Sequence, residues 1–137
     1  MAVVTTRGFY ALAAMTELLY HPQGKAVKIK TIAKNAKIPG KYLEQILLDL
    51  KKADLLSSVK GAHGGYMLSR EPDQVTIYEI LKAVEGAFLK LEYSAEDTAM
   101  QLYWDETFTS LRGLFERPLS DMRRYRAKAA EQFVFRI

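Results

Sequence analysis

The sequence predicts a mainly α-helical fold with one small β-hairpin, arranged as a winged helix-turn-helix followed by a long dimerisation helix. Three observations predict this fold class. Residues 6–52 hold three successive apolar patterns with helical spacing, residues 55–68 hold two strand-like runs around a glycine-rich tip, and residues 94–115 carry a wide apolar stripe. Two short helices joined by a tight turn and followed by a hairpin are typical of the winged form of the helix-turn-helix.

Three helices are expected before the hairpin. The first runs from about Thr6 to a break at residues 21–24, and the second covers residues 29–36. The second helix ends before Pro39, because proline disfavours helix in the residue that precedes it. The third helix starts at once, and its outer face is polar except for Leu48. Its buried stripe is expected to consist of Leu43, Ile46, Leu47 and Leu50.

A β-hairpin is expected directly after the third helix. Residues 55–60 are typical of a strand, residues 61–65 of a glycine-rich tip, and residues 66–68 of the returning strand. The tip would carry Lys60 and His63 on a flexible projection that can lie along a DNA groove.

A capping box opens a fourth helix. Thr76 and Glu79 have the spacing in which each side chain accepts from the other residue's backbone N–H, and the helix is expected to run to about Gly86. A loop over residues 87–93 follows, and a second cap-like start at Ser94 is expected to open the long helix.

The long helix is interpreted as a dimerisation helix. Its stripe consists of Met100, Trp104, Phe108, Leu111 and Phe115. That apolar face is wider than docking on one small domain requires; the alternative is a helix that lies entirely in the core of its own domain. Residues 119–135 predict a last, basic amphipathic helix. For its segment 123–128, DNA contacts and packing onto the long helix are both open, and packing is favoured.

The composition describes one compact domain without covalent cross-links. The chain has 137 residues, 49% of them hydrophobic, and no cysteine. Packing alone can stabilise a core of this size, and the lack of cysteine excludes disulfides, thiolate zinc sites and cysteine nucleophiles. No run of 18 apolar residues occurs, and Thr5, Arg7 and Glu17 interrupt the first 20 residues. We therefore expect no signal peptide, no membrane span and a cytoplasmic location.

The charge is divided unevenly along the chain. Residues 1–70 hold eleven Lys and Arg against four Asp and Glu, a net charge of +7, whereas residues 71–137 have a net charge of −3. This one-sided excess of cations favours a partner that carries phosphates. The alternative is that the lysines lie singly on solvated faces.

Four segments carry a resemblance to a known family. They are YLEQIL at residues 42–47, LLSSVKG at residues 55–61, the wing GAHGGY at residues 61–66, and IYEILKAVEG at residues 77–86. These motifs resemble the Rrf-two family of bacterial winged-helix transcription regulators, over most of residues 5–115. The resemblance implies a homodimer with crossed long helices that binds a roughly palindromic operator, with the recognition helix in the major groove and the wing in the minor groove. Residues 1–85 would then be the DNA-binding domain, and residues 86–137 a dimerisation and possible effector region.

The resemblance also assigns residues to the DNA interface. The expected base-reading residues are Lys41, Tyr42, Glu44 and Gln45 in the third helix, with Lys60 and His63 in the wing. The expected phosphate contacts are Thr6, Arg7, Tyr10, Lys28, Lys30 and Ser57. Gln45 can form a bidentate pair with an adenine edge, and Glu44 can accept from a cytosine amino group. For Tyr42 the alternative is packing against the hairpin as a half-buried residue.

The sequence departs from the family between the fourth helix and the long helix. Family members that sense iron, nitric oxide or redox state place three cysteines there, whereas residues 86–98 contain none. Glu92, Glu96 and Asp97 cannot replace thiolates around a soft iron–sulfur cluster, because carboxylates favour hard ions. We therefore expect neither a cluster nor any other cofactor or metal. An effector pocket, a docking surface and anchoring of the loop to the core are all open for Phe88, Leu89, Leu91 and Tyr93.

Among classes of function, an enzyme has the least support. The sequence holds no nucleophile elbow, no P-loop and no metal-ligand spacing. The leading interpretation is a sequence-specific DNA-binding transcriptional regulator, a repressor that binds a palindromic operator in double-stranded DNA as a homodimer, with a protein or small-molecule effector left open. The alternative is a protein-interaction module whose winged helix or long helix docks a partner enzyme that does the sensing.

Overall fold

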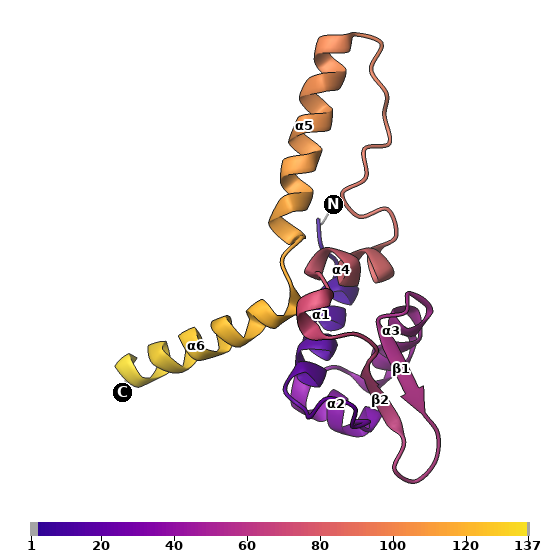
Figure 1. The fold of residues 1–137 in the computed structure, drawn as a ribbon, viewed down its shortest axis with the longest axis vertical. Coiled ribbons are helices and arrows are strands. Elements are labelled where there is room, and N and C mark those ends of the chain that lie inside the picture. Colours follow the sequence, from indigo (N-terminus) through magenta and orange to yellow (C-terminus); the bar gives the residue numbers. More distant parts are fainter. Residues whose placement is uncertain (1–2, 137) are drawn as a thin grey trace.

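A computed structural model describes residues 3–136, with side chains described as far as Gln132. The elements in chain order are α1 (Thr6–Leu19), α2 (Ile29–Ala36), α3 (Gly40–Lys52), β1 (Leu56–Val59), β2 (Gly65–Leu68), α4 (Ile77–Glu85), α5 (Thr98–Phe115) and α6 (Met122–Arg136), with short 3₁₀ turns before α4 and α6. Helices α1–α4 and the hairpin form a body from which α5 and α6 extend in different directions (Figure 1). Within residues 3–136, none of the helices combines the length and the apolarity that crossing a membrane requires.

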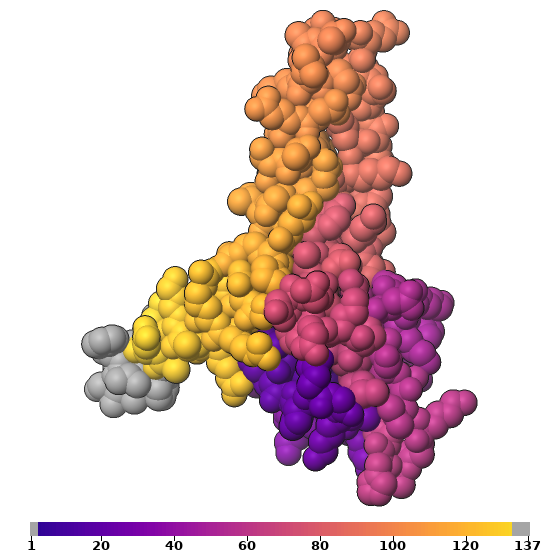
Figure 2. Space-filling model, in the orientation of Figure 1, coloured from indigo at the N-terminus to yellow at the C-terminus, as the bar shows by residue number. Residues whose placement is uncertain are grey.

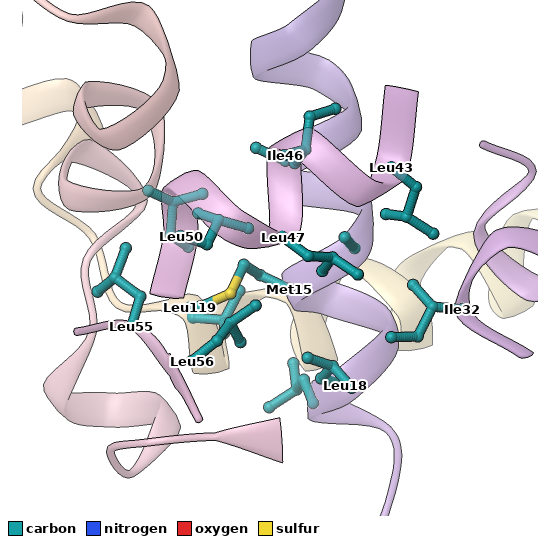
Figure 3. Close-up of a cluster of buried hydrophobic side chains, with 14 of the residues drawn as sticks. Met15, Leu18, Ile32, Leu43, Ile46, Leu47, Leu50, Leu55, Leu56 and Leu119 are labelled. Carbon is teal, nitrogen blue, oxygen red and sulfur yellow. The ribbon is translucent and has the colours of Figure 1, made fainter. Parts of the chain in front are cut away.

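The core of the body lies where α1, α2, α3 and the hairpin meet (Figure 3). The expected stripe of α3 is confirmed, since Leu43, Ile46, Leu47 and Leu50 are each at most 1% exposed. Burial of one leucine contributes roughly 1.5–3 kcal/mol, so these four side chains fix which face of α3 points outward. Leu48 lies on that outer face, as expected, and is 41% exposed.

A three-residue turn joins α2 to α3. Lys37 ends α2 with a left-handed backbone at φ 57°, and the N–H of Ile38 donates to the carbonyl oxygen of Ala33 at 3.0 Å. The Ile38 side chain is buried in the core, and Pro39 is the residue before α3. The turn is therefore anchored in the core by its middle residue, and α2 and α3 form a helix-turn-helix.

The hairpin is antiparallel, in the register that places Leu56 opposite Leu68. On the other side of β2, Val27 and Tyr66 each donate their N–H to the carbonyl oxygen of the other, at 2.8 Å. A Cβ atom on Gly65 would collide with the Val27 carbonyl, so this position requires glycine. The wing is thus tied to the segment that leads into α2.

Helix α4 closes the body against α1. The capping box is confirmed: the N–H of Glu79 donates to Thr76 Oγ1 at 3.1 Å, and the N–H of Thr76 donates to Glu79 Oε2 at 2.9 Å. At the other end of α4, Glu85 Oε1 accepts from the N–H of Thr5 at 2.9 Å. Gly8 is buried at this crossing, where a Cβ atom would meet the Glu85 side chain. The Glu85 carboxylate therefore satisfies a free donor at the start of α1.

Helix α5 begins later than expected. Its cap is Asp97, whose Oδ1 accepts from the N–H of Ala99 at 3.4 Å, and the expectation of a start at Ser94 is wrong. The N–H of Ala95 donates instead to Gln101 Oε1 at 2.6 Å, so the residues before Asp97 fold back along the helix. The Gln101 side chain thus accepts from the Ala95 N–H, which would have belonged to the first turn of α5 if the helix had started at Ser94.

The apolar face of α5 is not covered by the part of the chain that the structure describes. The structure describes all 18 residues of α5, and none of them is buried. Trp104 is 38% exposed and Met100 is 48% exposed. At the body end, the Phe115 ring packs edge-on against Phe88 with 5.1 Å between centroids. Figure 2 shows α5 and the loop before it as a column that rises from the body. The alternative that α5 lies in the core of its own domain is therefore wrong.

Helix α6 does not pack onto α5, so the favoured interpretation of the basic tail is wrong. Leu119 is fully buried in the core and turns the chain there, so α6 leaves at a wide angle to α5 (Figure 1). The corner is held by Arg117, which pairs with Asp121 at 2.9 Å and donates to Tyr125 Oη at 2.8 Å. Residues 123–132 are all exposed, so the described part of α6 also lacks the buried face of an amphipathic helix.

Candidate nucleic-acid interface

The outer face of α3 presents the expected base-reading residues Lys41, Tyr42, Glu44 and Gln45, all of them exposed. The Tyr42 ring lies against Tyr10 of α1, with 6.1 Å between centroids, and Lys41 Nζ stands 5.0 Å from the centre of the Tyr42 ring. Tyr42 is 46% exposed, and its ring partner is on α1, so the alternative of packing against the hairpin is wrong. The first half of α1 and the start of α3 therefore form one continuous surface.

A charged contact joins the same two helices. Arg7 of α1 forms an ion pair with Asp49 of α3, and Gln45 Nε2 donates to Asp49 Oδ1 at 3.1 Å. Two of the expected DNA contacts, Arg7 and Gln45, thus share the carboxylate of Asp49, which is not among the expected contacts. The sequence did hold a signal for this contact, because Gln45 and Asp49 are four residues apart on one helix, and side chains at that spacing form hydrogen bonds.

The expected lysines of α2 and the wing line one open groove of about 610 Å³. Lys28 and Lys30 lie at the start of α2 on one side, and Lys60 lies with the wing backbone on the other. All three lysines are exposed. The groove therefore brings together cations from two segments about 30 residues apart in the chain.

The expected contacts Ser57, His63 and Thr6 also lie outside the lining of this groove. Ser58 lines the groove, and its Oγ accepts from Lys51 Nζ at 2.6 Å. Its neighbour Ser57 is half-buried, because successive residues of a strand point to opposite faces. His63 is exposed at the wing tip, and Thr6 is exposed in the first turn of α1. The hairpin tip is at the end of the molecule opposite to the far end of α5 (Figure 1).

The comparisons with known proteins identify the family. Residues 4–125 match Rrf2, described as an iron-dependent transcriptional regulator. The chain belongs to the Rrf2 family. It is therefore a winged helix-turn-helix transcriptional regulator that binds DNA, as the motifs of residues 42–86 predict.

Individual Rrf2-family relatives agree over nearly the whole chain. The chain is 30% identical to the HTH-type transcriptional regulator CymR of Bacillus subtilis over 136 residues, 98% of this chain and 99% of the relative. The solved structure of CymR, the global cysteine regulator of B. subtilis, superposes with a TM-score of 0.78 over 91% of this chain and 98% of that one. The T. potens IscR structure has a TM-score of 0.74 at 31% identity, over 92% and 89% of the two chains. These similarities confirm the fold class.

The iron that the family description names does not fit the donors of this chain. The sequence has no cysteine, and among residues 3–132 no three His, Asp or Glu side chains gather where they could hold a metal ion. His21 Nε2 lies 2.7 Å from Oε2 of Glu17, four residues before it, and His63 is exposed on the wing. This Rrf2-family chain therefore lacks the thiolates that an iron–sulfur cluster needs.

The loop between α4 and α5 is anchored by an aromatic contact. Phe88 is 4% exposed, between Phe115 at 5.1 Å and Tyr78 at 5.9 Å between ring centroids. Anchoring of the loop to the body is therefore the role of Phe88, whereas Tyr93 is 73% exposed. The guanidinium of Arg112 donates to the carbonyl oxygen of Leu89 at 3.1 Å, which ties the loop to the side of α5.

Proposed function

We propose that this Rrf2-family regulator is a homodimeric repressor that binds a palindromic operator. One observation carries the proposal: the cationic groove and the polar face of α3 both belong to the body, and the uncovered apolar face of α5 extends away from that body. The first surface is suited to a duplex, and the second to a copy of the same helix.

In the proposed complex, α3 enters the major groove of the operator. Lys41, Tyr42, Glu44 and Gln45 face base edges there, and a bidentate pair between Gln45 and adenine is the strongest source of sequence choice. The wing lies in the minor groove, with Lys60 and His63, where the negative potential attracts cations. Phosphate contacts come from Thr6, Arg7, Tyr10, Lys28, Lys30 and Ser57, which position the protein without reading sequence.

The proposed dimer forms through α5. Its contacts are Met100, Trp104, Phe108, Leu111 and Phe115, so residues 86–137 serve dimerisation and residues 1–85 serve DNA binding. A two-fold axis between the α5 helices presents two copies of α3 to successive major grooves, about 34–36 Å apart, which predicts a palindromic operator. An effector, protein or small molecule, would act through the loop that leads into α5, without an iron–sulfur cluster. Such a regulator works in the cytoplasm, with the DNA.

The test is a gel-shift titration of the full chain against genomic fragments and against random duplexes of equal length. We expect binding to a subset of fragments at least a thousandfold tighter than to random duplex, within the range of about 10³–10⁷ for specific binders. Affinity should fall steeply with salt, because each phosphate that a lysine neutralises releases a counterion. Equal affinity for all duplexes at physiological salt would contradict the proposal.

A further inference from the structure

The carboxylate of Asp49 links Arg7 of α1 to Gln45 of α3. Asp49 lies on the third turn of α3, with its side chain 21% exposed, and its two carboxylate oxygens bind groups on different helices. Oδ2 pairs with the Arg7 guanidinium of α1, and Oδ1 accepts from Gln45 Nε2 at 3.1 Å. The amide of the proposed base-reading residue is therefore held by a carboxylate that is itself held from a second helix.

This contact selects one orientation of the Gln45 amide. An ionised carboxylate can only accept hydrogen bonds, so the nitrogen of the amide must face Asp49, and a flipped amide would place two oxygens against each other. The amide keeps its oxygen and one N–H free. Those are the acceptor and the donor that a bidentate pair with adenine requires.

Arg7 has a double role in the arrangement. Its guanidinium holds the Asp49 side chain in one position, and its positive charge offsets a carboxylate on a surface that would otherwise repel phosphates. A fixed side chain discriminates better than a mobile one, because supporting contacts hold the reading group in its productive geometry.

We propose that Asp49, held by Arg7, is a specificity-determining positioning residue, which sets the orientation of the Gln45 amide for adenine. The inference rests on the proposed function, in which Gln45 reads a base. Asp49 does not touch DNA in this proposal and acts through Gln45. The competing role is a purely structural link between α1 and α3, which would affect unfolding without affecting base choice.

The test compares Asp49→Asn, Gln45→Ala and the double variant with the wild type. An operator is first selected by the wild-type dimer from a randomised duplex library, and each protein is then titrated against four duplexes that differ at the position that Gln45 reads. Asparagine can donate or accept, so it supports both orientations of the Gln45 amide. We expect Asp49→Asn to reduce the preference for adenine about tenfold, within the range of one bidentate pair.

The matched control is Asp54→Asn, which removes the same charge from an exposed position just after α3. We expect Asp54→Asn to tighten binding to all duplexes alike and to leave the preference for adenine unchanged, whereas Asp49→Asn should lower that preference. In the Gln45→Ala background, Asp49→Asn should change the preference no further. Melting curves of the free proteins check that the variants remain folded.

The outcomes separate the two proposals. A wild-type protein without base preference would overturn the proposed function, and this inference with it. A wild-type preference that Asp49→Asn leaves intact would overturn the inference alone. The inference would also be overturned if Asp49→Asn lowered the preference equally in the Gln45→Ala background, because Asp49 would then not act through Gln45.

Discussion

The side chains on the outer face of α3 differ in what they contribute to a complex with DNA. Glu44 and Gln45 are neighbours in sequence, and both are exposed. In the proposed complex, the Glu44 carboxylate repels phosphates, and only a hydrogen bond from a base amino group offsets this cost. Glu44 therefore rejects wrong sequences more than it adds affinity. Gln45 both accepts and donates, so it contributes to affinity and to choice. In the same proposed complex, the phosphate-contacting Lys28 and Lys30 contribute mainly to affinity.

Gln45→Ala is expected to weaken binding at one base pair. The loss should be about 1–3 kcal/mol with the cognate base and close to zero with the other three bases, because the bidentate contact is removed. Titration of the variant against operator duplexes with each base pair at that position measures it. A loss of equal size for all four bases would show that Gln45 does not read sequence.

Lys28→Ala should behave differently. Lys28 is exposed at the start of α2 and lines the cationic groove. We expect all duplexes to bind more weakly by a similar factor, and the slope of log affinity against log salt to decrease by about one, because one phosphate contact is lost. Lys90→Ala, an exposed lysine on the loop before α5, is the control and should change neither quantity.

At the scale of the element, the capping box of α4 can be tested directly. Thr76→Ala removes the acceptor of the Glu79 N–H, which now donates to it at 3.1 Å. We expect a loss of about 1 kcal/mol in the free energy of unfolding, measured by urea titration. Thr98→Ala is the matched control, because Thr98 is exposed in the first turn of α5 and Asp97 is the cap there. Equal losses in the two variants would contradict a capping role for Thr76.

The same capping box should make stability depend on pH. Partial burial raises the pKa of Glu79, but the N–H of Thr76 and the charge of Arg70 outweigh it, and the pKa lies below its ordinary value. A lowered pKa in the folded state means that Glu79 stabilises the fold at neutral pH, and that this contribution is lost as pH falls below the usual range near 4.3. Glu79→Gln keeps a side-chain oxygen that can accept from the Thr76 N–H, but removes the negative charge. We expect the stability difference between wild type and this variant to shrink in acid.

At the scale of the whole molecule, the proposed dimer depends on the apolar face of α5. Trp104→Ala should weaken the proposed dimer by about 2 kcal/mol or more, since a large aromatic residue at the centre of an interface dominates its binding energy. Light scattering over a concentration series would show monomers at concentrations where the wild type is dimeric. Glu106→Ala, an exposed position on α5 outside the apolar stripe, should leave the dimer intact. A Trp104→Ala variant that remains fully dimeric would contradict the assignment of this face.

Local patterns were sufficient for most of the fold, and less so for the interface. The bounds of α2 and the buried stripe of α3 agree with expectation, because helical spacing and a following proline act within a few residues. The start of α5 was wrong, because the Gln101 side chain takes a backbone donor that the local pattern assigned to the helix. Asp49 was missed, because its importance comes from Arg7, which lies 42 residues away in the chain.

Residue types and their spacing along the chain were enough to assign the family, the helix-turn-helix with its wing, and the absence of thiolates for a cluster. Only the folded chain shows that Tyr42 lies on Tyr10, that Arg7 pairs with Asp49, and that α6 leaves the body at the corner formed by Leu119. Those contacts join residues distant in sequence, and the packing of the core selects them. No periodicity within a single helix encodes such a choice.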